Sequence, residues 1–112
     1  MNNSERRKHP RIRVKWPVTV LTDYAIIQAE TRNITINGIF ISSSELLRLN
    51  KSFPLRINPP NREPMKVTGK VVWSDHHAVD DQTVPYGMGI CFIRVSDKDR
   101  HFLEELISAH PH

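Results

Sequence analysis

The sequence predicts a mainly β protein: a six-stranded antiparallel β-barrel with a C-terminal α-helix. Short runs of β-forming residues recur from residue 14 onward, separated by turn signals. Asn37-Gly38 lies between two such runs, and this dipeptide is a strong hairpin signal. After residue 96 the apolar spacing changes from alternating to helical. Six short strands followed by one helix fit a small antiparallel barrel with a helix packed at an opening.

The chain of 112 residues has room for one domain. We divide it into a flexible basic N-terminal arm over residues 1–13 and a barrel with its helix over residues 14–112. Residues 1–15 carry six basic side chains and one acidic side chain, whereas the rest of the chain carries ten basic and eleven acidic ones. Because the positive charge is concentrated in the arm, the partner should be a multiply anionic one.

The strands are expected at residues 14–21, 25–36, 39–44, 53–57, 65–73 and 86–95. Pro17 in the first strand indicates an edge position or a bulge, because proline cannot donate to a ladder. Met65, Val67, Gly69, Val71 and Trp73 alternate with polar neighbours, which is typical of a half-buried strand. Gly87 and Gly89 in the last strand allow a bulge or a close backbone approach.

The C-terminal helix is expected over about residues 97–109. Ser96 is a suitable N-cap, and Asp99 three residues later completes a capping box with a short carboxylate. The apolar residues that follow are spaced to form one stripe on a helix: Phe102, Leu103, Leu106 and Ile107.

Two local motifs occur in a characteristic order. Residues 7–11, Arg-Lys-His-Pro-Arg, have the form RxxxR just ahead of the first strand. Residues 33–38, Asn-Ile-Thr-Ile-Asn-Gly, follow the form [D/N]xSxxG at the hairpin turn, with threonine in the serine position. Together they resemble the two-part signature of the PilZ family. The resemblance extends over nearly the whole chain, through Glu5-Arg6-Arg7 and residues 38–41, 69–73, 87–92 and 97–106.

This resemblance implies a PilZ-like six-stranded barrel that binds the bacterial second messenger cyclic di-GMP and has no catalytic activity. No cofactor and no metal are expected. It also implies a signalling partner protein of the motility, secretion, exopolysaccharide or attachment machinery. The ligand-binding residues that it implies are Arg6, Arg7, Arg11, Asn33, Thr35 and Gly38.

The chemistry of cyclic di-GMP suits these residue types. An arginine side chain can pair with phosphate through a planar fork, reach guanine O6 and N7, and stack on a base. Asn33 can accept from the guanine N1–H and N2–H₂ edge, and Thr35 keeps the hydroxyl expected of serine while adding a methyl group. Gly38 is expected to permit a positive φ and to leave room for the ligand.

The two motif arginines can reach one ligand, because four extended residues span at most about 13–14 Å. We expect the arm to fold over the ligand and so act as a switch. Arg6 is a candidate third contact, suited to an intercalated pair of ligands, although it could equally stay solvated.

The remaining polar and sulfur-containing residues are interpreted as structural. Trp73 and Met88 are assigned to the core rather than to the edge of the ligand site. Cys91 is expected in the core because its neighbours are apolar. His76-His77 with Asp80-Asp81 lacks the ligand spacing of a known metal site and is interpreted as a solvated loop.

The single cysteine excludes an intrachain disulfide and fits a reducing compartment. No apolar run approaches the length of a spanning helix, and the N-terminus lacks the apolar region of a signal peptide. The protein is therefore expected to be cytoplasmic, with no membrane insertion.

Two alternatives to a ligand receptor stay open, and a third function class is set aside. A nucleic-acid-binding barrel with a basic tail should expose aromatic residues on its strands and spread its charge over a groove, so no nucleic-acid partner is expected here. A PilZ-like adaptor would act by protein–protein interaction without ligand, and titration separates it from a receptor. No nucleophile with a spaced base and no acidic dyad is evident, so no enzyme is expected.

Overall fold

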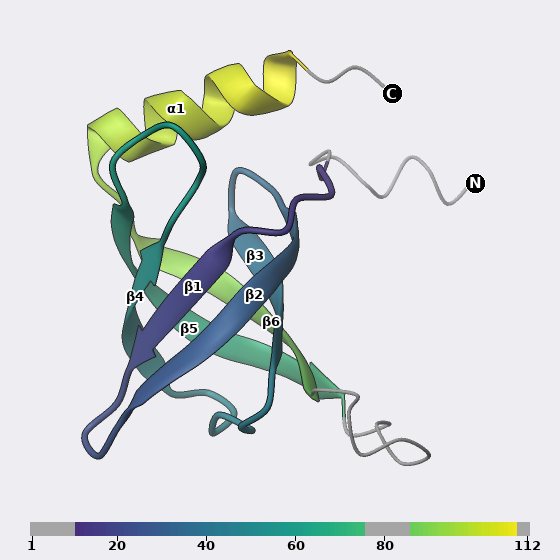
Figure 1. Cartoon of the computed structure of the whole chain (residues 1–112), viewed down its shortest axis with the longest axis vertical. Helices are drawn as coiled ribbons and strands as arrows, with labels where there is room; N and C mark the ends of the chain where they lie inside the picture. The colour runs from purple at the N-terminus through teal and green to yellow at the C-terminus, as the bar shows by residue number, and fades with distance from the viewer. Residues whose placement is uncertain (1–10, 76–85, 110–112) are drawn as a thin grey trace.

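The structure is a computed structural model that describes residues 11–75 and 86–109. Within these residues six antiparallel strands form a closed barrel, and one helix lies across its upper end (Figure 1). The elements are β1 (Pro17–Leu21), β2 (Ile26–Ile34), β3 (Gly38–Ser43), β4 (Ser52–Ile57), β5 (Met65–Asp75), β6 (Tyr86–Arg94) and α1 (Asp97–Ser108). The strands close in the order β1-β2-β3-β6-β5-β4. The predicted fold class is confirmed.

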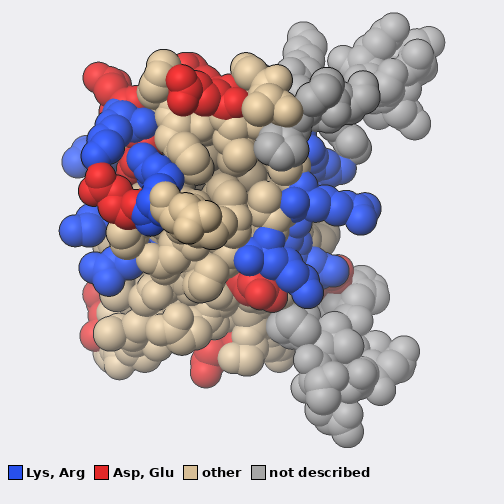
Figure 2. Space-filling model, turned by 45° about the horizontal axis from the view of Figure 1, so that its top comes forward, with Lys and Arg blue, Asp and Glu red and all other residues tan. Residues whose placement is uncertain are grey.

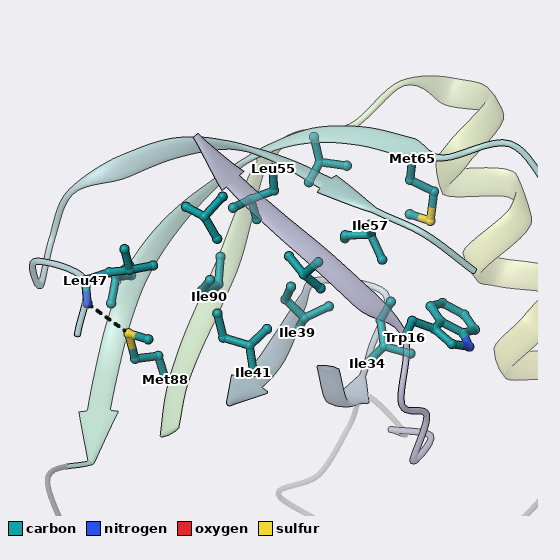
Figure 3. Packing of buried hydrophobic residues seen from close by; sticks show 14 of the residues in the cluster. Trp16, Ile34, Ile39, Ile41, Leu47, Leu55, Ile57, Met65, Met88 and Ile90 are labelled. Carbon is teal, nitrogen blue, oxygen red and sulfur yellow. Dashed lines mark hydrogen bonds between the residues drawn. The ribbon is translucent and has the colours of Figure 1, made fainter. Parts of the chain in front are cut away.

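The barrel interior is filled by the inward-facing residues of all six strands (Figure 3). Val18 and Val20 of β1 are fully buried, as is Ile57 of β4. Met88 of β6 is also fully buried, and its sulfur accepts a hydrogen bond from the Leu47 backbone N–H at 3.3 Å (Figure 3). The assignment of Met88 to the core is therefore confirmed.

The alternation predicted for β5 holds from Met65 to Val71 and then stops. The pairing register with β6 shifts between Val71 and Trp73, and Trp73 is 47% exposed. Because a β-bulge changes which face the following side chains occupy, Trp73 lies on the outer surface. Its assignment to the core was wrong.

Cys91 is also exposed, so its assignment to the core was wrong. The residues on either side of it along β6, Ile90 and Phe92, are buried and partly buried respectively. In a strand, neighbouring side chains point to opposite faces, which directs Cys91 outward. Because both neighbours in the sequence are apolar, the alternation was not evident from the sequence.

Pro17 is the first residue of β1, a position that a proline tolerates. Since β1 pairs with both β2 and β4, it is not an edge strand. Pro17 lacks an N–H, but its carbonyl accepts the backbone N–H of Asn58 at 2.9 Å. The sequence suggested an edge position or a bulge for Pro17, and the structure shows neither.

The helix α1 begins as the sequence predicts, because the Ser96 hydroxyl accepts the Asp99 N–H at 3.1 Å. The Asp99 carboxylate pairs at 3.3 Å with Arg62, which belongs to the loop between β4 and β5. In the same loop Glu63 pairs with Lys98, and this hydrogen bond and charge lower the pKa of the Glu63 carboxyl. Leu103 is fully buried and joins α1 to the core.

Within the described residues, α1 is the only helix, and it is neither long enough nor apolar enough to cross a membrane.

Candidate functional site

The N-terminal segment meets the β2–β3 turn through a single β-bridge. The Ile12 N–H donates to the Ile34 carbonyl at 2.9 Å, and the Ile34 N–H donates to the Ile12 carbonyl at 2.9 Å. Because Ile12 is also buried in the core, this bridge holds the chain firmly. It brings Arg11 into a hollow of about 270 Å³ together with Asn33, Thr35 and Gly38. Four of the six predicted site residues therefore line one hollow.

The residues after the bridge alternate between the core and the surface. Arg11, Arg13 and Lys15 are exposed, whereas Ile12 and Trp16 are buried. Because alternate residues of an extended segment share a face, the three cationic side chains lie on its outer face. Arg13 and Lys15 were not among the predicted site residues, although their spacing of two from Arg11 was a signal that could have revealed them.

The segment is fixed to β2 by the buried side chain of Thr31. The Thr31 hydroxyl donates to the Val14 carbonyl at 2.6 Å and accepts the Trp16 N–H at 2.8 Å. The Thr31 N–H in turn donates to the Trp16 carbonyl at 2.9 Å. The hydrogen bonds of the Thr31 side chain replace the backbone hydrogen bonds of a regular strand over residues 14–16. For this reason β1 begins at residue 17 and not at residue 14.

The turn between β2 and β3 is closed by the Thr35 hydroxyl. It accepts the backbone N–H groups of Asn37 and Gly38 at 3.0 and 3.1 Å. The Thr35 N–H also donates to the Gly38 carbonyl at 2.8 Å. A hydroxyl at this position therefore shapes the turn, as serine and threonine side chains commonly do. Its contact with a ligand stays a prediction.

Gly38 is required for space and not for its backbone conformation. Within the described residues no glycine has a positive φ, so the positive φ expected at Gly38 was wrong. Gly38 is the first residue of β3 and pairs with Cys91 of β6. A Cβ atom there would lie only 2.2 Å from the carbonyl oxygen of Ile90. The absence of a side chain lets β3 and β6 approach at the corner of the site.

A β-bulge in β2 places a fourth cation beside the turn. The register with β3 shifts between Thr31 and Asn33, which leaves Arg32 without a partner on β3. Arg32 is exposed, and its guanidinium lies 6.0 Å from the centre of the Phe40 ring. Arg32 was not among the predicted site residues, because it directly precedes the motif at residues 33–38.

A larger hollow of about 780 Å³ adjoins the first and shares Asn33 and Phe40 with it. Its charged lining residues are Arg13, Lys15, Glu30 and Arg32. With three cations and one carboxylate, this surface favours an anion. The volume lies within the range of about 300–1,000 Å³ that is typical of small-molecule sites.

An aromatic pair lies beside these hollows on the outer face of the barrel. The rings of Phe40 and Trp73 are 5.3 Å apart between centres and tilted by 41°. Two glycines of β6 leave room for them, since a Cβ on Gly87 would lie 3.2 Å from Phe40 and one on Gly89 would lie 3.5 Å from Trp73. Such rings can stack on a nucleobase or face a cation.

The other predicted residues lie outside the described part of the chain. These are Arg6 and Arg7, together with the loop residues His76, His77, Asp80 and Asp81. Among residues 11–75 and 86–109, no group of three or more potential ligands could hold a metal ion. Figure 2 shows basic side chains at the left and at the right of the view, with a broad uncharged area between them and acidic side chains among those on the left.

Comparison with known proteins identifies one family. The family model of the PilZ domain matches residues 5–109. A search of curated proteins gave no significant match. Among solved structures, the inhibitor of motility MotI/DgrA of Bacillus subtilis superposes with a TM-score of 0.77 at 17% identity, over 92% of this chain and 50% of that chain. The PilZ domain of YcgR from Escherichia coli, solved with c-di-GMP, has a TM-score of 0.75 at 14% identity, over 93% of this chain and 90% of that one.

A third neighbour is MrkH, described as a c-di-GMP-dependent transcription regulatory factor. It has a TM-score of 0.77 at 12% identity, over 92% of this chain and 50% of that chain. This chain thus spans about half the length of MotI/DgrA and MrkH. At these identities the likeness to solved structures establishes the fold.

Proposed function

This chain belongs to the PilZ family, and we propose that it is a non-catalytic receptor that binds cyclic di-GMP and signals to a partner protein. The observation that carries the proposal is the bridge between Ile12 and Ile34, which puts Arg11 in one hollow with Asn33. Arg11, the last residue of the RxxxR motif, thus lies beside residues of the second motif, although about twenty residues of sequence separate them.

The electrostatics of the surface suit the two phosphates of the ligand. Arg11, Arg13, Lys15 and Arg32 line the two adjoining hollows. Arginine can bind phosphate in a bidentate manner and can also reach a guanine edge, so Arg11 is assigned to these contacts. These four cations outnumber the two phosphates of one cyclic di-GMP, and with Glu30 counted the surface still carries more positive charge than that ligand carries negative charge.

The guanine bases have polar and apolar contacts available on the same surface. The Asn33 side-chain oxygen is able to accept from guanine N1–H and N2–H₂. The partly buried Phe40 ring borders both hollows and offers a face for stacking. Gly38 lines the smaller hollow, and the Thr35 hydroxyl holds the turn in shape.

Arg6 and Arg7 would complete the site from the N-terminal side. The anchor at Ile12 fixes the point from which the preceding residues approach the ligand. Closure of this arm over cyclic di-GMP would change the surface next to the turn, which is the signal that we propose a partner protein detects. A partner in motility, secretion or exopolysaccharide machinery and a cytoplasmic location stay predictions.

Calorimetric titration of the chain with cyclic di-GMP tests the proposal. We expect micromolar or tighter affinity, with a stoichiometry of either one or two ligands per chain. GTP and cyclic GMP serve as controls, because they share the guanine but not the cyclic dinucleotide geometry. Heats no larger than those of the controls would contradict the proposal and favour a ligand-free adaptor.

A further inference from the structure

A second basic surface lies on the other side of the barrel from the candidate ligand site. It surrounds a hollow of about 380 Å³ lined by Arg56, Lys66 and Arg94, with Leu21, Pro54 and Thr68 among its other residues. We call it the basic hollow. In the closed strand order, the pair β4–β5 that forms most of it is opposite the pair β2–β3 that carries the turn. The two surfaces are therefore separate.

The strand register forces like charges together in the basic hollow. Arg56 of β4 and Lys66 of β5 are direct cross-strand partners. Arg94 of β6 is opposite Thr68, which lies two residues along β5 from Lys66 and so on the same face. Like charges directly opposite each other destabilise a sheet. The arrangement is unfavourable for the isolated domain.

A β-bulge in β6 is what directs Arg94 into this cluster. Thr68 pairs with Arg94 while Gly69 pairs with Phe92, so Ile93 is an extra residue in the ladder. In regular alternation Arg94 would share the inward face of buried Ile90. The bulge instead exposes both Ile93, at 55%, and Arg94.

The three cations of the basic hollow, Arg56, Lys66 and Arg94, form no ion pair with the described residues. Residues 52–57, 65–74 and 86–94 contain no aspartate or glutamate. A cation cluster that lowers stability and forms no ion pair with the described residues indicates a binding surface for an external anion.

We propose that the basic hollow docks an acidic segment of a partner protein. Carboxylates of that segment would pair with Arg56, Lys66 and Arg94, and an apolar side chain would rest on Leu21, which is 41% exposed, and Pro54. The mixed lining favours a protein over other polyanions. None of the described residues that line the hollow is an aromatic one on which a nucleic-acid base could stack, and a flat bilayer does not enter a concavity.

This docking surface is independent of the proposed ligand site. Because β4–β5 and β2–β3 lie on opposite sides of the barrel, the acidic segment and cyclic di-GMP can bind at the same time. The partner would then remain attached while ligand binding changes the opposite side of the domain. The failure of one proposal leaves the other intact.

The test is fluorescence anisotropy with a labelled short peptide that alternates glutamate and leucine. We expect the double variant Arg56→Gln/Arg94→Gln to bind it at least about tenfold more weakly than wild type, which corresponds to about 1.4 kcal/mol. The double variant Arg48→Gln/Arg100→Gln removes two exposed arginines elsewhere and is the matched control for net charge. It should bind as wild type does, and cyclic di-GMP affinity should be unchanged in both.

Equal weakening in the two double variants would overturn the proposal, because it would indicate a general effect of charge. A thymidine oligonucleotide or phosphatidylglycerol vesicles that bind more tightly than the peptide at the same salt concentration would also overturn it.

The variant Lys66→Glu tests the like-charge argument by thermal unfolding. It converts the Arg56–Lys66 pair into opposite charges, so Tm should rise by about 1–5 °C while peptide binding is lost. A lower Tm would contradict the like-charge argument.

Discussion

Replacement of Arg11 by alanine is expected to weaken cyclic di-GMP binding by about 30-fold to 150-fold, on the order of 2–3 kcal/mol. The substitution removes a charge-assisted contact at the point where the N-terminal segment meets the turn. Because Arg11 is exposed and the Ile12–Ile34 bridge uses backbone atoms, the fold should be unaffected. Calorimetry gives the affinity, and circular dichroism monitors the fold.

Arg48→Ala is the matched control for the loss of an arginine. Arg48 is exposed in the connection between β3 and β4 and does not line either ligand-site hollow. Arg7→Ala should weaken binding as much as Arg11→Ala does, since both belong to the RxxxR motif. If Arg11→Ala loses no more affinity than Arg48→Ala, the assigned role of Arg11 is wrong.

Gly38→Ala is expected to lower the stability of the fold by about 3 kcal/mol and Tm by about 12–24 °C. The new Cβ would lie 2.2 Å from the carbonyl oxygen of Ile90. Since that atom belongs to the backbone of the paired strand, it cannot turn aside as a flexible side chain could. Relief of the clash requires β3 and β6 to separate at the corner of the ligand site. Thermal unfolding measures the effect.

Two further variants separate the causes. Gly89→Ala adds a Cβ 3.5 Å from Trp73, an ordinary contact, and should be tolerated far better. Gly38→Asn distinguishes space from backbone conformation, because asparagine tolerates a positive φ better than most residues. If space is the cause, Gly38→Asn destabilises at least as much as Gly38→Ala. A nearly wild-type Tm for either Gly38 variant would refute the clash.

The sequence predicted those features that depend on local patterns. Alternation located β5, the Asn37-Gly38 pair located the β2–β3 turn, and Ser96 located the start of α1. These signals arise from side-chain burial and from backbone capping, which act over a few residues. The resemblance to a known family, and not periodicity, supplied the predicted ligand and its contact residues.

The features that were missed arise mostly at β-bulges. Trp73 and Arg94 follow register shifts that turn them to the outer surface, and Arg32 is the extra residue of the bulge in β2. A bulge depends on how two strands pair, so a pattern along one strand does not reveal it. The steric requirement for glycine at position 38 was not predicted either. It depends on the close approach of Ile90, a residue far along the chain.

An amide NMR titration with cyclic di-GMP tests most directly whether the N-terminal segment and the turn enclose one ligand site. We predict the largest chemical-shift changes at residues 11–15 and 30–40, with amides of Arg56, Lys66 and Arg94 nearly unchanged. Changes centred on β4 and β5, with Arg11 and Asn33 unaffected, would contradict the account.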